Sequence, residues 1–263
     1  MTTLLDTPVD RTKPDIPALA VRDAHKRFGA VVALDGISLD VHHGEVLALL
    51  GDNGAGKSTL IKCLSGVHRL DSGAIAMDGV PVTIHAPSDA RALGVETVYQ
   101  DLALFDNLPP TDNFYAGREL AGPKWVPRSI RFLKRKRMTE STREVLERLQ
   151  VSLPDFHTTV GLMSGGQRQA VAVSRAAAFA SKVVILDEPT AALGVRESRR
   201  VLDLVLRLRS ENRAVIVVSH AMDHVMEIAD RAVVLRRGQK VGELAPSSET
   251  YTEIVSLIVG GGE

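Results

Sequence analysis

The chain has 263 residues, of which 44% are hydrophobic, so it is long enough and apolar enough to form a sizeable core. Lysine plus arginine and aspartate plus glutamate both total 32, which excludes the global basic field that drives non-specific binding to nucleic acids. The single cysteine, Cys63, cannot form an intramolecular disulfide and stands among apolar residues, as a small buried hydrophobe would.

Residues 1–18 are predicted to be a flexible leader, because the first 17 contain three prolines, three aspartates and only scattered apolar residues. This segment lacks a basic stretch followed by a long apolar one. No apolar stretch in the chain reaches the roughly 18 to 20 residues needed to span a bilayer. We therefore expect a chain without a targeting signal or a membrane span, whose folded domain covers 19–263.

Alternating apolar and polar residues open the folded part. They occupy 18–28, 37–41 and 74–82, written ALAVRDAHKRF, ISLDV and AIAMDGVPV, and such alternation is typical of strands with one buried face. Asp78-Gly79 is a strong signal for a two-residue hairpin turn. The pattern predicts an antiparallel β-layer beside the rest of the fold.

Short continuous apolar runs follow at 46–50, 183–186, 215–218 and 232–235, and they suit strands that are buried on both faces. Helical patterns cover 57–65, 164–180, 197–209 and 222–229. Strands that alternate with helices in this way favour a mostly parallel sheet with crossover helices. The fold class is therefore α/β.

Between about 101 and 160 the strand signals disappear. The stretches TDNFYAGREL and MTESTREVLERLQ have helical spacing, with Thr111 and either Thr139 or Ser141 as N-caps. We expect a helical subdomain at approximately 101–178, inserted in the rest of the domain. Its apolar residues either line a groove for a partner's helix or form its own core: Leu102, Leu104, Phe105, Leu108 and Phe114.

A basic segment, RSIRFLKRKRM at 128–138, concentrates positive charge with no acid between. Two interpretations stay open for it. It contacts anionic lipid headgroups, or it is the solvated face of a helical hairpin.

The phosphate loop is the clearest functional motif. Residues 51–58, GDNGAGKS, fit the pattern G-x-x-x-x-G-K-[ST] and lie between a predicted strand and a predicted helix, as that motif requires. Glycines let the amide N–H groups turn toward a phosphate, Lys57 adds a full charge, and Ser58 is a ligand for Mg²⁺. The residues expected to bind nucleotide here are Gly51, Asn53, Gly54, Ala55, Gly56, Lys57, Ser58 and Thr59.

Two acids end a predicted strand in VVILDE. Asp187 supplies the acid that holds magnesium in such sites, and Glu188 is the candidate general base that polarises an attacking water. Binding alone requires only the first acid. A solvated acidic strand end is the alternative interpretation.

The stretch 163–176, MSGGQRQAVAVSRA, opens a long predicted helix, and Ser164, Gly165, Gly166 and Gln167 form a second candidate anion site at its N-terminus. One nucleotide does not need two such sites. At this point the chain resembles the ATP-binding subunits of ABC transporters, whose signature is usually LSGGQ. Met163 replaces the leucine with a side chain of similar size.

The resemblance runs from about residue 19 to the end and implies an ABC ATPase fold, with a P-loop core, an antiparallel β-subdomain and an inserted α-helical subdomain. It implies that Phe28 stacks on adenine, that Gln100 contacts Mg²⁺ and links the nucleotide to the helical lobe, and that His220 contacts the γ-phosphate. Ordinary structural roles for these three residues stay open.

The same resemblance implies a head-to-tail dimer, in which the segment 164–167 of one chain closes over ATP held by the phosphate loop of a second copy. The sequences DEPTAALGVRES and IHAPSDARALGVETVYQDLALFDNL resemble the branch that serves monosaccharide importers, in its single-cassette form, which is often linked with fructose uptake. Gly194 stands where the family usually has an aspartate. Glycine has no carboxylate, so the contact that the family's aspartate makes across the dimer is not expected here.

The implied function is ATP hydrolysis, by Glu188, His220 and Lys57, that drives sugar uptake from the cytoplasmic face of the inner membrane. The implied partners are permease subunits and, through them, an external sugar-binding protein, with no nucleic acid. An ABC-type ATPase that is not coupled to transport is the alternative. A chromosome-maintenance protein would insert a long coiled coil between the phosphate loop and Ser164, for which this chain has no room, whereas a regulatory nucleotide-binding protein stays open.

Overall fold

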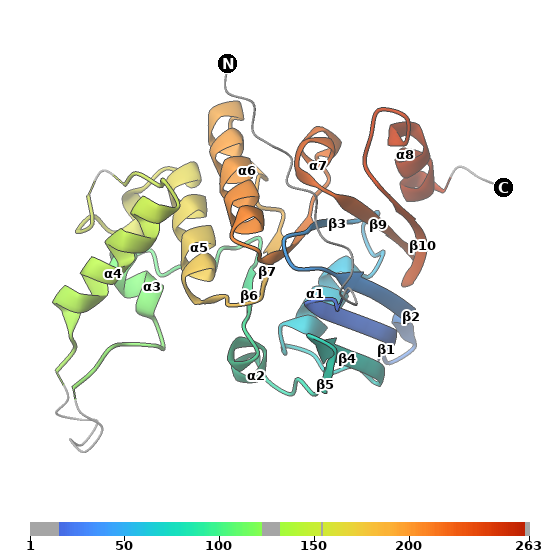
Figure 1. The fold of residues 1–263 in the computed structure, drawn as a ribbon, viewed down its shortest axis with the longest axis horizontal. Coiled ribbons are helices and arrows are strands. Elements are labelled where there is room, and N and C mark those ends of the chain that lie inside the picture. Colours follow the sequence, from blue (N-terminus) through green and yellow to red (C-terminus); the bar gives the residue numbers. More distant parts are fainter. Residues whose placement is uncertain (1–15, 123–131, 154, 261–263) are drawn as a thin grey trace.

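The computed structural model describes residues 16–122, 132–153 and 155–260. A four-stranded antiparallel sheet in order β2-β1-β4-β5 opens the fold (Figure 1). Its strands are β1 (Leu19–Phe28), β2 (Val31–Val41), β4 (Ser72–Met77) and β5 (Val80–Val82). Asp78 and Gly79 join β4 to β5 with φ of 49° and 77°, as a tight hairpin turn with two left-handed residues requires, so the predicted turn and β-layer are confirmed.

A six-stranded sheet in order β10-β9-β3-β8-β7-β6 forms the centre. Its strands are β3 (Val46–Leu50), β6 (Val95–Val98), β7 (Val183–Asp187), β8 (Ala214–Val218), β9 (Arg231–Arg236) and β10 (Gln239–Leu244). Neighbours from β6 to β9 pair in parallel, and β10 pairs antiparallel with β9. The mostly parallel sheet is confirmed. The sequence did not predict β6 or β10, because both lie at sheet edges and carry polar residues.

Successive residues of the central strands enter different packing layers. Leu47 and Leu49 of β3 pack toward the antiparallel sheet and α1 (Lys57–Leu64). Val184 and Leu186 of β7 pack toward α5 (Gly165–Phe179) and α6 (Val195–Ser210). Because both faces are covered, these strands have no polar face and read as continuous apolar runs.

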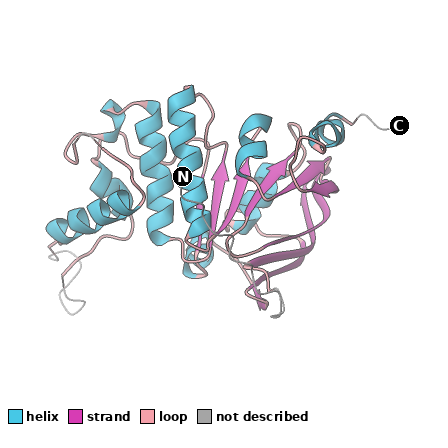
Figure 2. Cartoon of the chain, turned by 45° about the horizontal axis from the view of Figure 1, so that its top comes forward, coloured by secondary structure: helices cyan, strands magenta, loops and turns pink. Residues whose placement is uncertain are grey.

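The remaining helices of the described chain are α2 (Pro87–Ala92), α7 (Met222–Ile228) and α8 (Tyr251–Val259) near the sheets, and α3 (Pro110–Tyr115) and α4 (Arg135–Arg148) farther out. A 3₁₀ turn spans Val160–Leu162. In Figure 2 the strands gather in the half of the molecule that carries the C-terminus, and the other half is helical. None of the helices in the described part of the chain is long and apolar enough to cross a membrane.

The helical lobe, which consists of α3, α4 and α5, has its own apolar core. Phe114 of α3, Met138 of α4 and Val171 of α5 meet in it, and Phe114 is 2% exposed. Phe105 is instead 53% exposed. Phe114 therefore fills the core of the lobe and Phe105 reaches its surface, while a groove for a partner's helix stays a prediction.

Two predicted helix starts are wrong. Helix α3 begins at Pro110, so Thr111 lies inside it and is buried, because proline at the first helical position is already set at the helical φ. Helix α4 begins at Arg135, before Thr139 and Ser141, because the basic residues ahead of them are themselves good helix formers.

Some predictions concern residues beyond the described ones. Residues 1–15 of the leader and 128–131 of the basic segment lie outside the described residues. Residues 132–137 of that segment are exposed, and Arg135 pairs with Asp112 at 3.5 Å. The domain limits, 19–263 with a subdomain at about 101–178, stay predictions. Cys63 is buried, as expected, and burial raises the pKa of its thiol to about 11.

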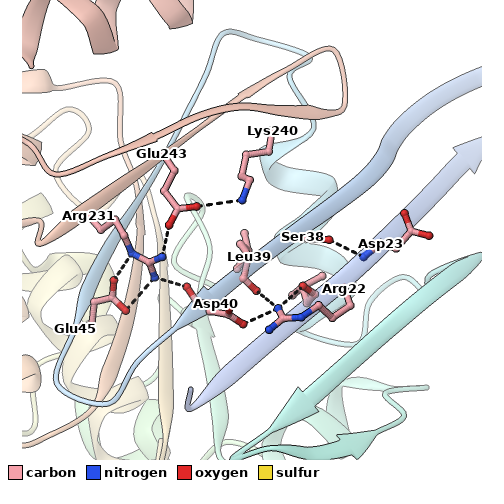
Figure 3. A network of polar contacts seen from close by, with 10 residues as sticks. Arg22, Asp23, Ser38, Leu39, Asp40, Glu45, Arg231, Lys240 and Glu243 are labelled. Atoms are coloured by element: carbon pink, nitrogen blue, oxygen red, sulfur yellow. Dashed lines mark hydrogen bonds and ion pairs between the residues drawn. The ribbon is translucent and has the colours of Figure 1, made fainter. Parts of the chain in front are cut away.

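A polar network joins the two sheets (Figure 3). Arg231 at the start of β9 donates to Glu45 at 2.8 Å and to the carbonyl of Asp40 at 2.6 Å, and it also pairs with Glu243 of β10. Asp40 of β2 pairs with Arg22 of β1 at 2.6 Å. Burial alone would raise the pKa of Glu243, but hydrogen bonds from Lys240 and Arg231 outweigh it and hold that pKa below its usual range. The β9–β10 hairpin is thus fixed against β2.

Candidate functional site

The backbone of the phosphate loop is shaped by close contacts that only glycine permits. Gly51 has φ 144°, and a Cβ there would stand 2.2 Å from the carbonyl oxygen of Leu235. Gly56 has φ 107°, and its Cβ would stand 2.7 Å from the carbonyl oxygen of Ala33. A Cβ on Gly54 would meet nothing within 4 Å. The loop is therefore packed on strands at both ends and open at its tip, where a ligand can approach.

The β9–β10 turn ties the loop down from behind. Gly238 of this turn donates its N–H to the carbonyl of Ala55 at 3.0 Å. Its own carbonyl accepts from the N–H of Asp35 at 2.7 Å. The loop is held between β2 and the hairpin by backbone bonds, so its open amide groups have a fixed direction.

Lys57, the first residue of α1, is buried with 7% exposure. Its ammonium group donates to the carbonyls of Gly51 at 2.6 Å and Asp52 at 3.0 Å. Burial lowers the pKa of Lys57, and the charges of Glu188, Asp52 and Asp187 partly oppose this. A phosphate oxygen would be a stronger acceptor than a carbonyl, because a hydrogen bond between charged groups is stronger than one to a neutral group.

Two acids stand opposite this lysine. Burial raises the pKa of Asp187 at the end of β7, and the charges of Lys57, Lys62 and His220 partly oppose it. Burial also raises the pKa of Glu188, chiefly against the attraction of His220. A carboxyl whose pKa is shifted toward neutrality is suited to accept a proton at physiological pH.

One carboxylate oxygen of Glu188 makes no hydrogen bond but lies within ion-pair range of His220. This oxygen, Oε1, is buried, and Nε2 of His220 lies 3.3 Å away. This contact is electrostatic, since its geometry does not make a hydrogen bond. The side chain of Glu188 is 15% exposed and that of His220 is 53% exposed. An orphaned acceptor at the wall of a cavity can orient a water molecule or take a proton from it.

One cavity of about 400 Å³ gathers most of the predicted site. Gly51 is buried and does not line it. The predicted residues that do line it are Phe28, Asn53, Gly54, Ala55, Gly56, Lys57, Ser58, Thr59, Gln100, Asp187, Glu188 and His220. Residues from five separate parts of the sequence therefore converge on one space.

The donor set of this cavity fits magnesium. Ser58, Gln100 and Asp187 supply a hydroxyl, an amide oxygen and a carboxylate, and hard cations such as Mg²⁺ prefer oxygen ligands. The described residues contain no group of three or more His, Cys, Asp or Glu side chains that could hold a metal ion. An ion held here would thus depend on phosphate oxygens for the rest of its coordination.

An apolar wall completes the cavity. Phe28 is 44% exposed, and its ring meets that of His68 edge-on with centroids 5.1 Å apart. Val31 and Val32 beside it are 64% and 38% exposed. These two residues, together with Ala33 and Val218, also line the cavity and were not predicted from the sequence. The sequence signal for Val31 and Val32 is their position at the start of the strand that follows Phe28 after two residues.

The second candidate anion site lies elsewhere in the same chain. Ser164 is the N-cap of α5, accepting from the N–H of Gln167 at 3.3 Å, and Gln167 Oε1 accepts from the N–H of Ser164 at 2.9 Å. Ser164, Gly166 and Gln167 line a cavity of about 520 Å³ that shares no lining residue with the first. One chain therefore does not bring its segment 164–167 to its own phosphate loop.

Glu197 of α6 packs over this second site. A Cβ on Gly166 would stand 2.5 Å from Cγ of Glu197, and a Cβ on Gly194 would stand 2.7 Å from its Oε2. Gly194 is the N-cap of α6, with φ −70° and ψ 168°, a conformation open to any residue. The carboxyl of Glu197 thus fills the space that a side chain at 194 would occupy.

Comparison with known proteins agrees with this geometry. The family model described as ABC transporter matches residues 34–191, more than half of the chain. The chain belongs to the ABC transporter family. Within that family it is 46% identical to the xylose/arabinose import ATP-binding protein XylG of Sulfolobus acidocaldarius, over 91% of this chain and 93% of the relative. It is 45% identical to the fructose import ATP-binding protein FrcA of Rhizobium meliloti, over 94% and 95%.

A ribose import ATP-binding protein, RbsA 1 of Rubrobacter xylanophilus, is 42% identical over 93% of this chain, which covers only 47% of that longer protein. Among solved structures, a nucleotide-free ATP-binding cassette from an ABC transporter matches with a TM-score of 0.78 at 26% identity, over 92% of this chain and 97% of that one. The ADP conformation of another ABC transporter cassette matches with a TM-score of 0.76 at 26% identity, over 93% and 99%. The ABC ATPase fold is thereby confirmed.

The raised pKa of Glu188 predicts a pH-dependent cost in this ABC transporter chain. In the unfolded chain the carboxyl of Glu188 loses its proton near its ordinary pKa of 4.5, whereas the folded chain keeps this proton to a higher pH. Folding stability therefore falls as pH rises from the unfolded pKa through the folded pKa. We expect Glu188→Gln to stabilise the chain at pH 8 by on the order of 1 kcal/mol, or about 2–4 °C in the unfolding midpoint. Thermal unfolding at pH 4 and pH 8 measures this. The difference should vanish at pH 4, and Glu140→Gln, on the exposed face of α4, should change neither midpoint.

Proposed function

We propose that the chain is the ATP-hydrolysing subunit of a membrane importer for a monosaccharide. The observation that carries this proposal is the convergence of Lys57, Asp187, Glu188 and His220 on one cavity beneath a glycine-shaped loop. The names of the relatives, which are import ATP-binding proteins for xylose/arabinose, fructose and ribose, support the coupling to sugar uptake.

In the proposed mechanism the phosphates of ATP lie on the tip of the phosphate loop. Lys57 exchanges its two carbonyl partners for phosphate oxygens, and the amides of 53–58 donate to the same phosphates. The apolar wall at Phe28, Val31 and Val32 receives the adenine ring. These contacts bind and orient the nucleotide without taking part in bond cleavage.

Glu188 and His220 act on the reacting end. Oε1 of Glu188 accepts a proton from the attacking water, and His220 donates toward the γ-phosphate. Ser58, Gln100 and Asp187 would hold Mg²⁺ through their oxygen atoms. When bound, this ion neutralises charge on the phosphates. Because Gln100 also begins the segment that leads to the helical lobe, a shift of Gln100 on nucleotide binding would move that segment and the lobe.

A second copy of the chain completes the site. The segment 164–167 has the capping geometry of an anion-binding helix terminus but lies in a different cavity from the phosphate loop. A head-to-tail pair brings the segment of one chain over the nucleotide of the other, which covers the γ-phosphate and excludes bulk water.

The permease is expected to dock between the core and the helical lobe. A groove of about 250 Å³ is lined there by residues of α2, β6, α3 and α5, with Phe105 at its surface. The segment after Gln100 forms one wall, and Arg175 of α5 holds it by donating to the carbonyls of Leu102 at 3.1 Å and Ala103 at 2.8 Å. The groove has both apolar and charged lining, including Glu96 and Arg175, and such a groove fits an amphipathic cytoplasmic helix of the permease.

In this assembly the chain sits peripherally on the cytoplasmic face of the inner membrane, and an external binding protein delivers the sugar to the permease. Fructose and xylose/arabinose are the preferred candidates, because the chain covers 95% and 93% of the relatives named for those sugars.

Replacing the proposed base separates binding from hydrolysis. Glu188→Gln keeps the size of the side chain but cannot take a proton, so we expect ATP affinity within about twofold of wild type and turnover reduced by about 10²-fold or more. Equilibrium ATP binding and phosphate release measure the two effects. Turnover at the wild-type rate would contradict the assignment of Glu188 and, with it, the proposed mechanism.

Complementation tests the shared site. Lys57→Ala removes the charge opposite the phosphates, and Gly165→Asp places a negative charge on the opposing helix terminus, so each variant alone should be inactive. In an equal mixture about half of the dimers contain one intact composite site, so up to about a quarter of wild-type phosphate release should return. A mixture no more active than either variant would rule out sites built from two chains.

Docking is tested by Phe105→Glu, which charges the surface of the groove. We expect sugar uptake by cells to be lost while phosphate release by the purified chain stays within about twofold of wild type. Val259→Glu is the matched control, because Val259 is 79% exposed on α8, away from the groove, and should change neither. Normal uptake with Phe105→Glu would exclude this surface as the docking site.

A further inference from the structure

The segment that follows Glu188 has a strained backbone. Glu188 has φ 51° and Ala192 has φ 57°, and residues other than glycine adopt this left-handed conformation only at a cost in free energy. Such residues persist where the surrounding structure holds them in place. Something must therefore keep residues 188–192 in this conformation.

Two hydrogen bonds fasten the segment to its surroundings. The N–H of Glu188 donates to the carbonyl of Val218 at 2.9 Å. Farther along, Oγ1 of Thr190 lies 3.0 Å from Nδ1 of His224, and either atom can donate, according to the histidine tautomer. Within the described residues, no other hydrogen bond ties 189–193 to another element. The side chain of Thr190 is thus the anchor between the two strained residues.

His224 lies on α7, which packs against the core and pairs with α6. Val225 and Ile228 of α7 are buried in the apolar core, and Glu227 of the same helix pairs with Arg199 of α6. Thr190 is 8% exposed. Thr190 and His224 border a small cavity whose other lining is mostly apolar, including Ala48, Leu202 and Val217, with Ser219 as a polar neighbour. His224 is half-buried, and a mainly apolar environment strengthens the hydrogen bond that it makes with Thr190.

The same two segments also meet at the nucleotide cavity. Oε1 of Glu188 and Nε2 of His220 lie 3.3 Å apart. Thr190 and His224, which come two and four residues later in the same segments, form a second contact between them. Neither Thr190 nor His224 lines the nucleotide cavity. The second pair can therefore act on the reaction only through the position of the first.

We propose that Thr190 and His224 are positioning residues, whose hydrogen bond holds the strained segment so that the carboxyl of Glu188 faces the attacking water. Without that bond, residues 188–192 relax toward ordinary backbone angles and Glu188 moves away from His220. The role rests on the proposed function of Glu188 as general base. It predicts slower turnover with unchanged nucleotide binding, because the phosphate loop is held by other contacts.

The experiment uses the full-length chain with variants that differ in one hydrogen bond. Thr190→Val has the same shape but no hydroxyl, and His224→Ala removes the ring; each should lower kcat about tenfold while ATP affinity stays within about twofold. Thr190→Ser and His224→Asn keep groups able to bond and should stay close to wild type. The double variant Thr190→Val/His224→Ala should be no slower than the slower single one, because both lose the same bond.

Several outcomes would overturn the proposal. One is a kcat within twofold of wild type in both Thr190→Val and His224→Ala. Another is a Thr190→Ser variant as slow as Thr190→Val, and a third is a double variant in which the two losses multiply. A loss of ATP affinity and of the thermal unfolding midpoint in step with kcat would mean a merely structural role. Glu188→Gln serves as the reference variant. If Glu188→Gln turns over at the wild-type rate, the proposed function is wrong. If Glu188→Gln is inactive and Thr190→Val is fully active, only the positioning role is wrong.

Discussion

The close packing of backbone against backbone around the phosphate loop is the constraint on which the rest of the structure depends. Gly51 touches the carbonyl of Leu235 and Gly56 that of Ala33, so a side chain at either position would push the loop off two strands. The hairpin that presents Gly238 to Ala55 is held in turn by Arg231, which joins β9 to β2. The loop is thus ordered before any ligand arrives, so the affinity for a ligand is not reduced by the entropy of ordering the loop.

The ionisable side chains around this loop lower the folding stability of the chain, because they are partly buried. Burial lowers the pKa of Lys57 and raises those of Asp187 and Glu188, so each group is pushed toward its neutral form and their mutual attraction opposes this only in part. A ligand that carries phosphates and a divalent cation would supply the missing partners. The folded chain holds this arrangement because a large apolar core surrounds it, as is common where function and stability conflict.

One segment connects the two cavities of the chain. It begins at Glu188 on the wall of the nucleotide cavity, passes through the strained residues to Gly194, and reaches Glu197, which packs over Gly166 at the other cavity. In a head-to-tail pair the second cavity would face the nucleotide of the neighbouring chain. A change at Glu188 would then be transmitted along a short segment toward both nucleotides, which would give a physical basis for coupling between them.

The sequence by itself determined the features that depend on neighbours along the chain. The glycine spacing of 51–58, the apolar runs of the central strands and the Asp78-Gly79 turn each follow from local geometry, and the structure contains them where they were expected. Local signals failed at the starts of α3 and α4, where several residues compete as caps, and at β6 and β10, which owe their pairing to a neighbouring strand.

Only the tertiary structure decided which distant residues meet. It brought Phe28, Gln100, Asp187 and His220 to one cavity, uncovered Val31 and Val32 beside Phe28, and paired Thr190 with His224 across 34 positions of sequence. It also kept the segment 164–167 apart from the phosphate loop. The physical reason is that such contacts depend on how sheets and helices pack, and packing responds to the shape of the whole core rather than to any local pattern.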